Sequence, residues 1–303
     1  MSNLNTVQIP CYGRGMTTPL VRGEPVEVAP GVHVIADNRV PLVPNVGIVL
    51  GDRAALVVDT GIGPRNGAHV LALARSLAGN RPLFLTTTHF HPEHGFGAQA
   101  FRGAATIVYN RAQRDELHRK GPGYIEMFKG LGPHVAAELA GVELVEPDVV
   151  YDGSAEIDLG GRRVVLTARG PAHSVGDQTV LVDDQVLFTG DLAETRMFPI
   201  APHFPPYDTD ADLSRWIEVL DSLITLAPSV VVPGHGEVSD VSVLRDVRGY
   251  LDYVHSEALR LRSGGTDLSA ATSAISAGAR QRREDWDNAE LIGLAVQSCY
   301  AAQ

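Results

Sequence analysis

Short runs of β-branched and other apolar residues indicate where strands lie in the first part of the chain. Residues 31–36, 45–50 and 54–58 show this pattern, and Gly51-Asp52-Arg53 provides a tight turn between the last two runs. Because strands joined by tight turns pair in opposite directions, these residues predict an antiparallel sheet.

Apolar residues at helical spacing follow this sheet. Pro64 begins a predicted helix in which Val70, Leu73 and Leu77 recur at intervals of three or four residues, and Gly79-Asn80 ends it. The pattern therefore changes from strand to helix within about ten residues, and it changes back again after Asn80.

A long segment between residues 110 and 150 interrupts this alternation. Gly121-Pro122-Gly123 and Gly132-Pro133 are expected to break it into helical pieces. Its aromatic and aliphatic residues either line a substrate pocket or belong to the plain core. These residues are Tyr124, Ile125, Met127 and Phe128.

Strands and helices alternate again in the second half of the chain. Asp183-Asp184 is a suitable two-residue hairpin turn between strands at 178–182 and 185–189. A helix over about 212–226 places Trp216 on its apolar face, so we interpret Trp216 as a core residue.

These patterns divide the chain into three predicted regions. An N-terminal arm covers residues 1–30, a central domain with a helical insertion at about 110–150 covers 31–239, and a helical appendix covers 240–303. The appendix either covers a site or forms a subunit contact, so a homo-oligomer is left open.

The composition agrees with a soluble enzyme that needs no disulfide bonds. With 303 residues and 44% hydrophobic content, the chain can bury a large core. Cys11 and Cys299 are the only cysteines and lie near opposite ends, so a cytoplasmic location is expected. Residues 1–23 contain no unbroken apolar run, so we expect no secretory signal and no membrane partner.

The net charge of −11 argues against nucleic acid as a partner, because an acidic surface repels phosphates. One basic run, Arg280-Gln281-Arg282-Arg283, precedes Glu284 and Asp285. We interpret this run as a solvated, partly self-paired helix start. The expected partner is a small-molecule substrate.

The hexapeptide His89-Phe90-His91-Pro92-Glu93-His94 carries the strongest chemical signal. It follows the strand-like run Leu83 to Thr88 and holds three imidazoles and a carboxylate. Imidazole suits zinc, iron and copper, and a carboxylate supplies a negative oxygen. On a turning segment such donors can serve two adjacent metals, whereas the alternative is a solvated loop that happens to be rich in histidine.

Three further donors stand at the ends of predicted strands, each close to glycine. His173 follows the strand at 163–168, Asp191 follows Phe188-Thr189-Gly190, and His235 lies in Pro233-Gly234-His235-Gly236.

In these motifs the chain resembles the metallo-β-lactamase fold superfamily, whose pattern is HxHxDH, then a lone His, a lone Asp and a lone His. Val57-Val58-Asp59-Thr60-Gly61 is similar to an early strand-end motif of that family, and the resemblance covers roughly residues 30 to 240. It implies an α/β fold of the αββα type, in which two mixed β-sheets are flanked by helices.

The resemblance also implies a ligand set of seven residues and a catalytic role for Asp191 and Glu93. His89, His91 and His173 would hold a first metal; Glu93, His94 and His235 would hold a second; and Asp191 would bridge the two. Asp59 would orient the histidine loop, although it is equally well interpreted as a turn residue.

Glu93 departs from the family pattern, which usually has Asp at this position. The extra methylene moves the carboxylate outward, so the second metal would be held more weakly, be displaced or be absent. We expect two divalent ions, zinc before iron or manganese, with a single ion as the alternative.

The implied function is a metal-dependent hydrolase that uses a metal-activated hydroxide on an ester, thioester or lactone. The alternatives are β-lactam hydrolysis, an iron-dependent oxidoreductase with a thiol-type substrate, and a binding protein without activity. His203, in the Pro-rich stretch 199–206, is either an acid or substrate contact in the cleft or an ordinary loop histidine.

Overall fold

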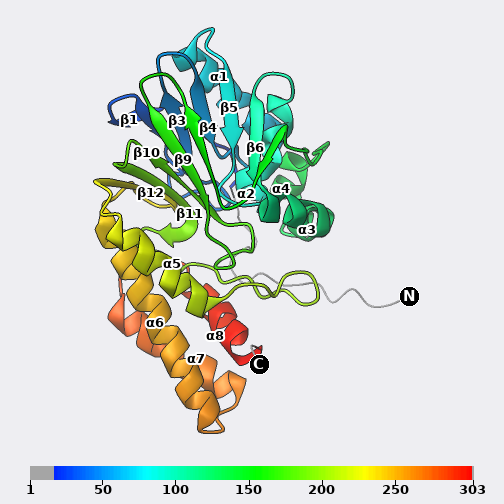
Figure 1. The fold of residues 1–303 in the computed structure, drawn as a ribbon. Coiled ribbons are helices and arrows are strands. Elements are labelled where there is room, and N and C mark those ends of the chain that lie inside the picture. The colour runs from blue at the N-terminus through cyan, green and yellow to red at the C-terminus, as the bar shows by residue number, and fades with distance from the viewer. Residues whose placement is uncertain (1–16, 302–303) are drawn as a thin grey trace.

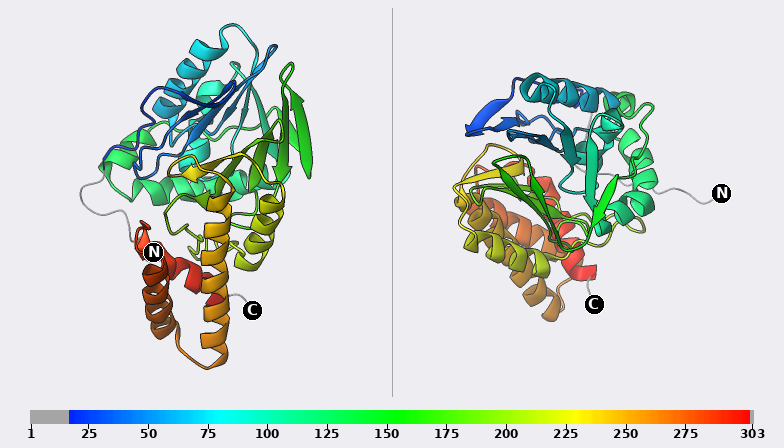
Figure 2. Two further views of the ribbon diagram at one scale, coloured as in Figure 1. Left: turned by 90° about the vertical axis from the view of Figure 1, so that its left-hand side faces the viewer. Right: turned by 45° about the horizontal axis from the view of Figure 1, so that its top comes forward.

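Two mixed β-sheets stacked face to face form the centre of the protein, as seen in a computed structural model that describes residues 17–301 (Figures 1 and 2). Helices cover the outer face of each sheet. The predicted αββα fold is therefore confirmed. Cys11 lies outside the described residues, and the division into three regions stays a prediction.

The first sheet has seven strands in chain order, and its first four are antiparallel while the rest are parallel. The antiparallel pairing predicted for residues 31–58 is thus confirmed, and an additional strand, β1, precedes it. The strands are β1 (Val26–Ala29), β2 (Val32–Ile35), β3 (Val46–Leu50), β4 (Ala55–Val58), β5 (Leu83–Thr86), β6 (Thr106–Asn110) and β7 (Val149–Tyr151).

The second sheet has five strands in the order β12-β11-β10-β9-β8, of which only β11 and β12 pair in parallel. Asp183 and Asp184 join β10 to β11 with φ angles of 49° and 55°, so the predicted hairpin turn is confirmed. The strands are β8 (Ser154–Asp158), β9 (Arg163–Ala168), β10 (Gln178–Val182), β11 (Val186–Glu194) and β12 (Val230–His235).

Three apolar layers hold the sheets and helices together. One lies between the two sheets, one between the first sheet and α1 (Pro64–Ala78), and one between the second sheet and the helices α5 (Leu213–Thr225) and α6 (Val241–Ser263). Trp216 is fully buried in the last layer, and its indole N–H donates to the backbone oxygen of Leu192 at 3.0 Å. Its interpretation as core is confirmed.

The insertion between β6 and β7 contains α3 (Arg111–Lys129) and α4 (Pro133–Glu138). The break expected at Gly121-Pro122-Gly123 is wrong, because α3 continues through Pro122. A proline removes one backbone hydrogen bond. The helix nevertheless has a buried face that includes Leu117, Tyr124 and Phe128, and this packing keeps it intact.

The C-terminal region forms a helical layer below the second sheet (Figure 1). It comprises α6, α7 (Leu268–Arg282), the short 3-10 helix η2 (Ala289–Leu291) and α8 (Ile292–Ala301). The basic run at 280–283 ends α7 and does not begin a helix, so that interpretation is corrected. Arginine is favourable there because the carbonyl end of a helix carries partial negative charge.

No helix within residues 17–301 is both long and apolar enough to cross a lipid bilayer.

Candidate metal centre

The histidine loop leaves the end of β5 and turns at once into α2 (Pro92–Gly95), which continues into the 3-10 helix η1 (Phe96–Phe101). His91 is the residue before the first helical position, which Pro92 occupies with its fixed φ. His89 and His91 therefore lie in the bend between β5 and α2, while Glu93 and His94 lie in the helical turn. All four side chains are buried.

The three later donors come from the second sheet. His173 lies in the loop between β9 and β10, Asp191 lies within β11, and His235 ends β12. Gly234 provides the space for Asp191, because a side chain at Gly234 would collide with the Asp191 carboxylate.

All seven sequence-predicted ligands meet in two adjacent groups. One group contains three histidines and the other contains Glu93, His94, Asp191 and His235, and in each the ligand atoms lie within 4.8 Å of one another. Apart from Asp191, which falls in the second group, the members of each group are those that the resemblance implies. The histidines of the first group are His89, His91 and His173.

Asp191 also reaches the first group, so that one of its carboxylate oxygens faces each group. Its Oδ2 is 3.8 Å from Nε2 of both His89 and His173. Its Oδ1 is 3.2 Å from Nε2 of His94 and 3.6 Å from Nε2 of His235. This is the arrangement that a bridging carboxylate requires.

Each ligand imidazole has its other nitrogen fixed by a neighbour. Such contacts set the orientation of a metal-binding ring and select which nitrogen carries the proton. The contacts are His89 Nδ1 to Thr88 Oγ1 at 3.2 Å, His91 Nε2 to the Tyr124 hydroxyl at 3.2 Å, His94 Nδ1 to Asp59 Oδ2 at 2.9 Å, His173 Nδ1 to the Ile200 oxygen at 2.9 Å, and His235 Nδ1 to the Val43 oxygen at 2.9 Å.

Asp59 contacts the histidine loop directly, as the orienting role requires. Its backbone has a φ of 68°, and its side chain is buried beneath the loop. Its Oδ2 accepts from His94, and its Oδ1 accepts from the backbone N–H of Thr88 at 2.7 Å.

Several inward-facing ligand atoms have no hydrogen-bond partner although they are buried. They are His89 Nε2, Glu93 Oε2, His94 Nε2 and Asp191 Oδ1. A buried polar atom without a partner costs about 1–3 kcal/mol. Cations between these atoms would satisfy them, and imidazole with carboxylate suits zinc, iron or manganese. The residues therefore fit a metal centre.

The electrostatics of the two groups differ. Burial lowers the pKa of His89 well below its ordinary value and that of His173 to about 3, so both imidazoles are neutral and able to bind a cation. Burial also lowers the pKa of His94, but the Asp191 and Asp59 carboxylates outweigh this effect, so that the pKa of His94 lies well above its usual range. Burial raises the pKa of Asp191, but His94 and His235 outweigh this and hold it low.

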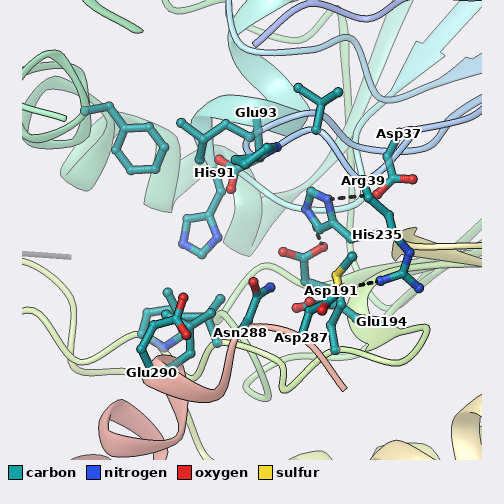
Figure 3. A pocket seen from close by; sticks show the side chains of 18 of the residues that line it. Asp37, Arg39, His91, Glu93, Asp191, Glu194, His235, Asp287, Asn288 and Glu290 are labelled. Carbon is teal, nitrogen blue, oxygen red and sulfur yellow. Dashed lines mark hydrogen bonds and ion pairs between the residues drawn. The ribbon is translucent and has the colours of Figure 1, made fainter. Parts of the chain in front are cut away.

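A cavity of about 360 Å³ opens beside the metal ligands (Figure 3). His91, Glu93, Asp191 and His235 reach it, and most of the wall is apolar. The apolar lining residues are Val40, Pro41, Leu42, Tyr124, Phe128, Met197, Ile200, Pro202, Phe204 and Leu291. Tyr124 and Phe128 thus contribute both to the core and to the cavity.

His203 does not line this cavity, although its neighbours Pro202 and Phe204 do. Its side chain is half-buried, and Nδ1 has no hydrogen-bond partner. Its role as an acid or substrate contact stays a prediction.

Sequence reasoning missed several residues of the site. Glu194 lines the cavity. Apart from Asp191, it is the only charged residue in β11, a strand that is buried throughout, and a charged residue in an otherwise apolar strand was the signal that could have identified it. No sequence signal identifies Asp208 or Asp287, because each contacts a residue that is far away in the chain.

The family is established by a direct match. Residues 39–235 match the family model of the metallo-beta-lactamase superfamily. The chain therefore belongs to the metallo-beta-lactamase superfamily.

Among individual proteins, the chain is similar to a linear primary-alkylsulfatase from Pseudomonas sp. (strain ATCC 19151). The two are 27% identical in an alignment 243 positions long that covers 69% of this chain and 45% of the relative. The fold is similar to that of the inverting sec-alkylsulfatase Pisa1 from Pseudomonas sp., with a TM-score of 0.72 and 17% identity, over 92% of this chain and 50% of that one. The chain spans about half the length of these two relatives.

The fold is also similar to that of a metallo-beta-lactamase from Pontibacter korlensis. The TM-score is 0.59 and the identity 20%, over 76% of this chain and 98% of that one. The likeness to the alkylsulfatase structure therefore extends over more of this chain than the likeness to the lactamase.

Proposed function

We propose that this protein is a hydrolase that holds two divalent metal ions, zinc first, and cleaves a carboxylic ester, thioester or lactone. The single observation that carries the proposal is the position of Asp191 between two ligand groups, beside a largely apolar cavity. The superfamily match supports the same class of reaction.

Different residues of the chain would hold the metals and orient the water. When bound, two divalent ions would supply a water of lowered pKa and polarise a substrate oxygen. His89, His91 and His173 would hold one ion, and Glu93, His94 and His235 the other. The Asp191 carboxylate would keep the two at a fixed separation and accept a hydrogen bond from the attacking water, which orients it.

The cavity wall favours a neutral acyl substrate. Arg39 is the only lysine or arginine among the described residues that line it. Its guanidinium is already bound to Glu237 at 2.6 Å and to Asp287 at 2.7 Å. The protein itself thus offers little positive charge to an anionic group, whereas the apolar wall can pack against an acyl or alkoxy chain.

A sulfate ester is the second candidate, because the relative that is 27% identical is an alkylsulfatase. Its anionic group would have to be held by the metals. The two candidates therefore differ in the charge of the substrate: a carboxylic ester would bring a neutral group to the metals, and a sulfate ester would bring an anionic one.

A metal-replete activity screen tests the proposal. The protein is loaded with zinc, manganese or iron and given aryl carboxylic esters, thioesters, lactones, β-lactams, and primary and secondary alkyl sulfates. We expect turnover of acyl esters that is lost with a chelator and in Asp191→Ala. Turnover of sulfates alone would select the second candidate, and oxygen uptake with a thiol substrate would select an oxidoreductase. No rate above that of Asp191→Ala on any substrate would overturn the proposal.

A further inference from the structure

Lys120 is a buried cation without a role in the chemistry described so far. The chain contains two lysines. Lys129 is a surface residue with 38% of its side chain exposed, whereas the side chain of Lys120, on the same helix α3, is only 2% exposed. Burying an ammonium group is costly unless it is fully paired, so the partners of Lys120 are informative.

Three carboxylates surround the Lys120 ammonium. Its Nζ donates to Glu116 Oε1 at 2.6 Å and to Asp208 Oδ1 at 2.8 Å, and it lies 3.0 Å from Asp210 Oδ2. Burial lowers the pKa of Lys120, but Glu116 and Asp208 outweigh this and raise it above the ordinary value. The group is therefore a fixed positive charge held by two hydrogen bonds and one further ion pair.

One branch from Lys120 reaches His91. The Tyr124 hydroxyl donates its hydrogen to Asp208 Oδ2 at 2.6 Å, so its oxygen is free to accept from His91 Nε2 at 3.2 Å. The proton of His91 is thereby placed on Nε2. Its Nδ1, which lies 3.0 Å from His173 Nε2, keeps a lone pair facing the first ligand group.

A second branch reaches the loop that carries His173. Glu116 Oε2 accepts from the backbone N–H of Gly176 at 2.6 Å, three residues after His173. Gly176 lies so close to Gln113 of α3 that no side chain would fit. The loop is thus pressed against the helix that holds Lys120.

We propose that Lys120 is a positioning residue for the first metal, acting through Asp208 and Tyr124 on His91 and through Glu116 on the His173 loop. One ammonium group would fix two of the three histidine ligands relative to each other. This inference rests on the metal sites of the proposed function, and it assigns a purpose to the insertion, which supplies α3.

Metal binding tests this inference directly. Tyr124→Phe removes the hydroxyl and keeps the ring that packs on Phe90 at 5.1 Å, and Lys120→Met removes the charge. Matched controls are Tyr151→Phe, which removes another buried hydroxyl, and Lys129→Met. Each change is also made in a His235→Ala background, where the second group lacks a ligand and the first can be measured alone. The readouts are the zinc content, the rate of zinc loss to a chelator, and the visible spectrum of the cobalt-substituted protein.

We expect Tyr124→Phe and Lys120→Met to weaken the first metal by about 10–100-fold and to alter the cobalt spectrum, while both controls bind as wild type. A purely structural role would lower the unfolding temperature of the metal-free protein and leave the zinc loss rate unchanged; that result overturns the inference. If Lys120→Met does not fold, Tyr124→Phe and Asp208→Asn decide. If wild type itself binds no metal, the proposed function fails instead.

Discussion

Asp59 shows how much a single side chain that binds no metal controls at the residue scale. Its carboxylate holds His94 from beneath through Oδ2 and the Thr88 backbone through Oδ1. Asparagine tolerates the positive φ of this position. We predict that Asp59→Asn weakens binding of the second metal by about 10–100-fold, because the new amide nitrogen must face either the His94 ring N–H or the Thr88 backbone N–H and can accept from neither. Titration with zinc against a chromophoric chelator measures this.

The first metal provides the internal control for Asp59→Asn. His91 and His173 are held by Tyr124 and Ile200, and His89 reaches Asp59 only through the Thr88 hydroxyl, so the first metal is expected to be weakened less than the second. Equal weakening of both metals would contradict the assignment of Asp59 to His94.

The candidate ligands could be selected from the sequence by residue type and position, whereas most of the groups that contact their outer nitrogens could not. Histidine and aspartate beside glycine at strand ends are recognisable by residue type. The partners of His173 and His235, however, are the backbone oxygens of Ile200 and Val43, and any residue type supplies such an oxygen. Tyr124 and Asp208 become neighbours only when α3 packs against the loop after β11.

At the scale of elements, the segment before α8 is held across the cavity by β-type contacts. Asp287 N–H donates to the Arg196 oxygen at 3.0 Å, and Phe198 N–H donates to the Asp287 oxygen at 3.0 Å. The Asp287 side chain, 62% exposed, pairs with Arg39 (Figure 3). The C-terminal region thus supplies part of the cavity wall, which was one of the two uses the sequence left open.

We predict that Asp287→Asn raises KM up to about fivefold and changes kcat less. An exposed ion pair contributes at most about 1 kcal/mol, and losing it loosens η2 above the cavity without touching a metal ligand. Steady-state kinetics on the substrate found in the screen provide the measurement.

The matched control for Asp287→Asn is Asp221→Asn, which breaks an exposed pair with Arg248 at a distance from the cavity. It should leave KM unchanged. If both variants behave alike, the Arg39 pair does not shape the cavity.

Most elements follow from the sequence because their periodicity is local. The strand at 178–182 and the hairpin after it, for example, are specified by neighbouring residues. The continuation of α3 through Pro122 is decided instead by distant packing of Tyr124 and Phe128, so the local signal of Gly121-Pro122-Gly123 was misleading.

At the scale of the whole molecule, the metal centre and the C-terminal helices share one core. Trp216 packs against His173 with ring centroids 5.5 Å apart, and it belongs to the same apolar cluster as Ile292 and Cys299 of α8. Metal binding should therefore also lower the fraction of molecules in which α8 is open.

We predict that Cys299 alkylates slowly and that zinc slows it further. Burial raises the pKa of this thiol from its ordinary value near 9 to about 12, so at pH 8 the reactive thiolate forms only when α8 opens. Zinc at 100 times its dissociation constant stabilises the fold by about 2.7 kcal/mol, which is about 100-fold in the opened population. Iodoacetamide labelling of a Cys11→Ala variant, followed by mass spectrometry, measures the rate.

The sign of the accompanying pH effect is fixed. An unfolded thiol ionises near pH 9 while the folded one stays protonated, so stability falls as pH rises from about 9 towards about 12. A labelling rate that does not respond to zinc would show that α8 opens independently of the metal centre.

The wall that η2 adds to the cavity has a consequence for the order of events during synthesis. The last of the candidate ligands, His235, leaves the ribosome well before Asp287 and Leu291 do. The nascent chain can therefore assemble its cation-binding groups while the chamber beside them is still open on one side, and the enclosure is completed only by the trailing helices.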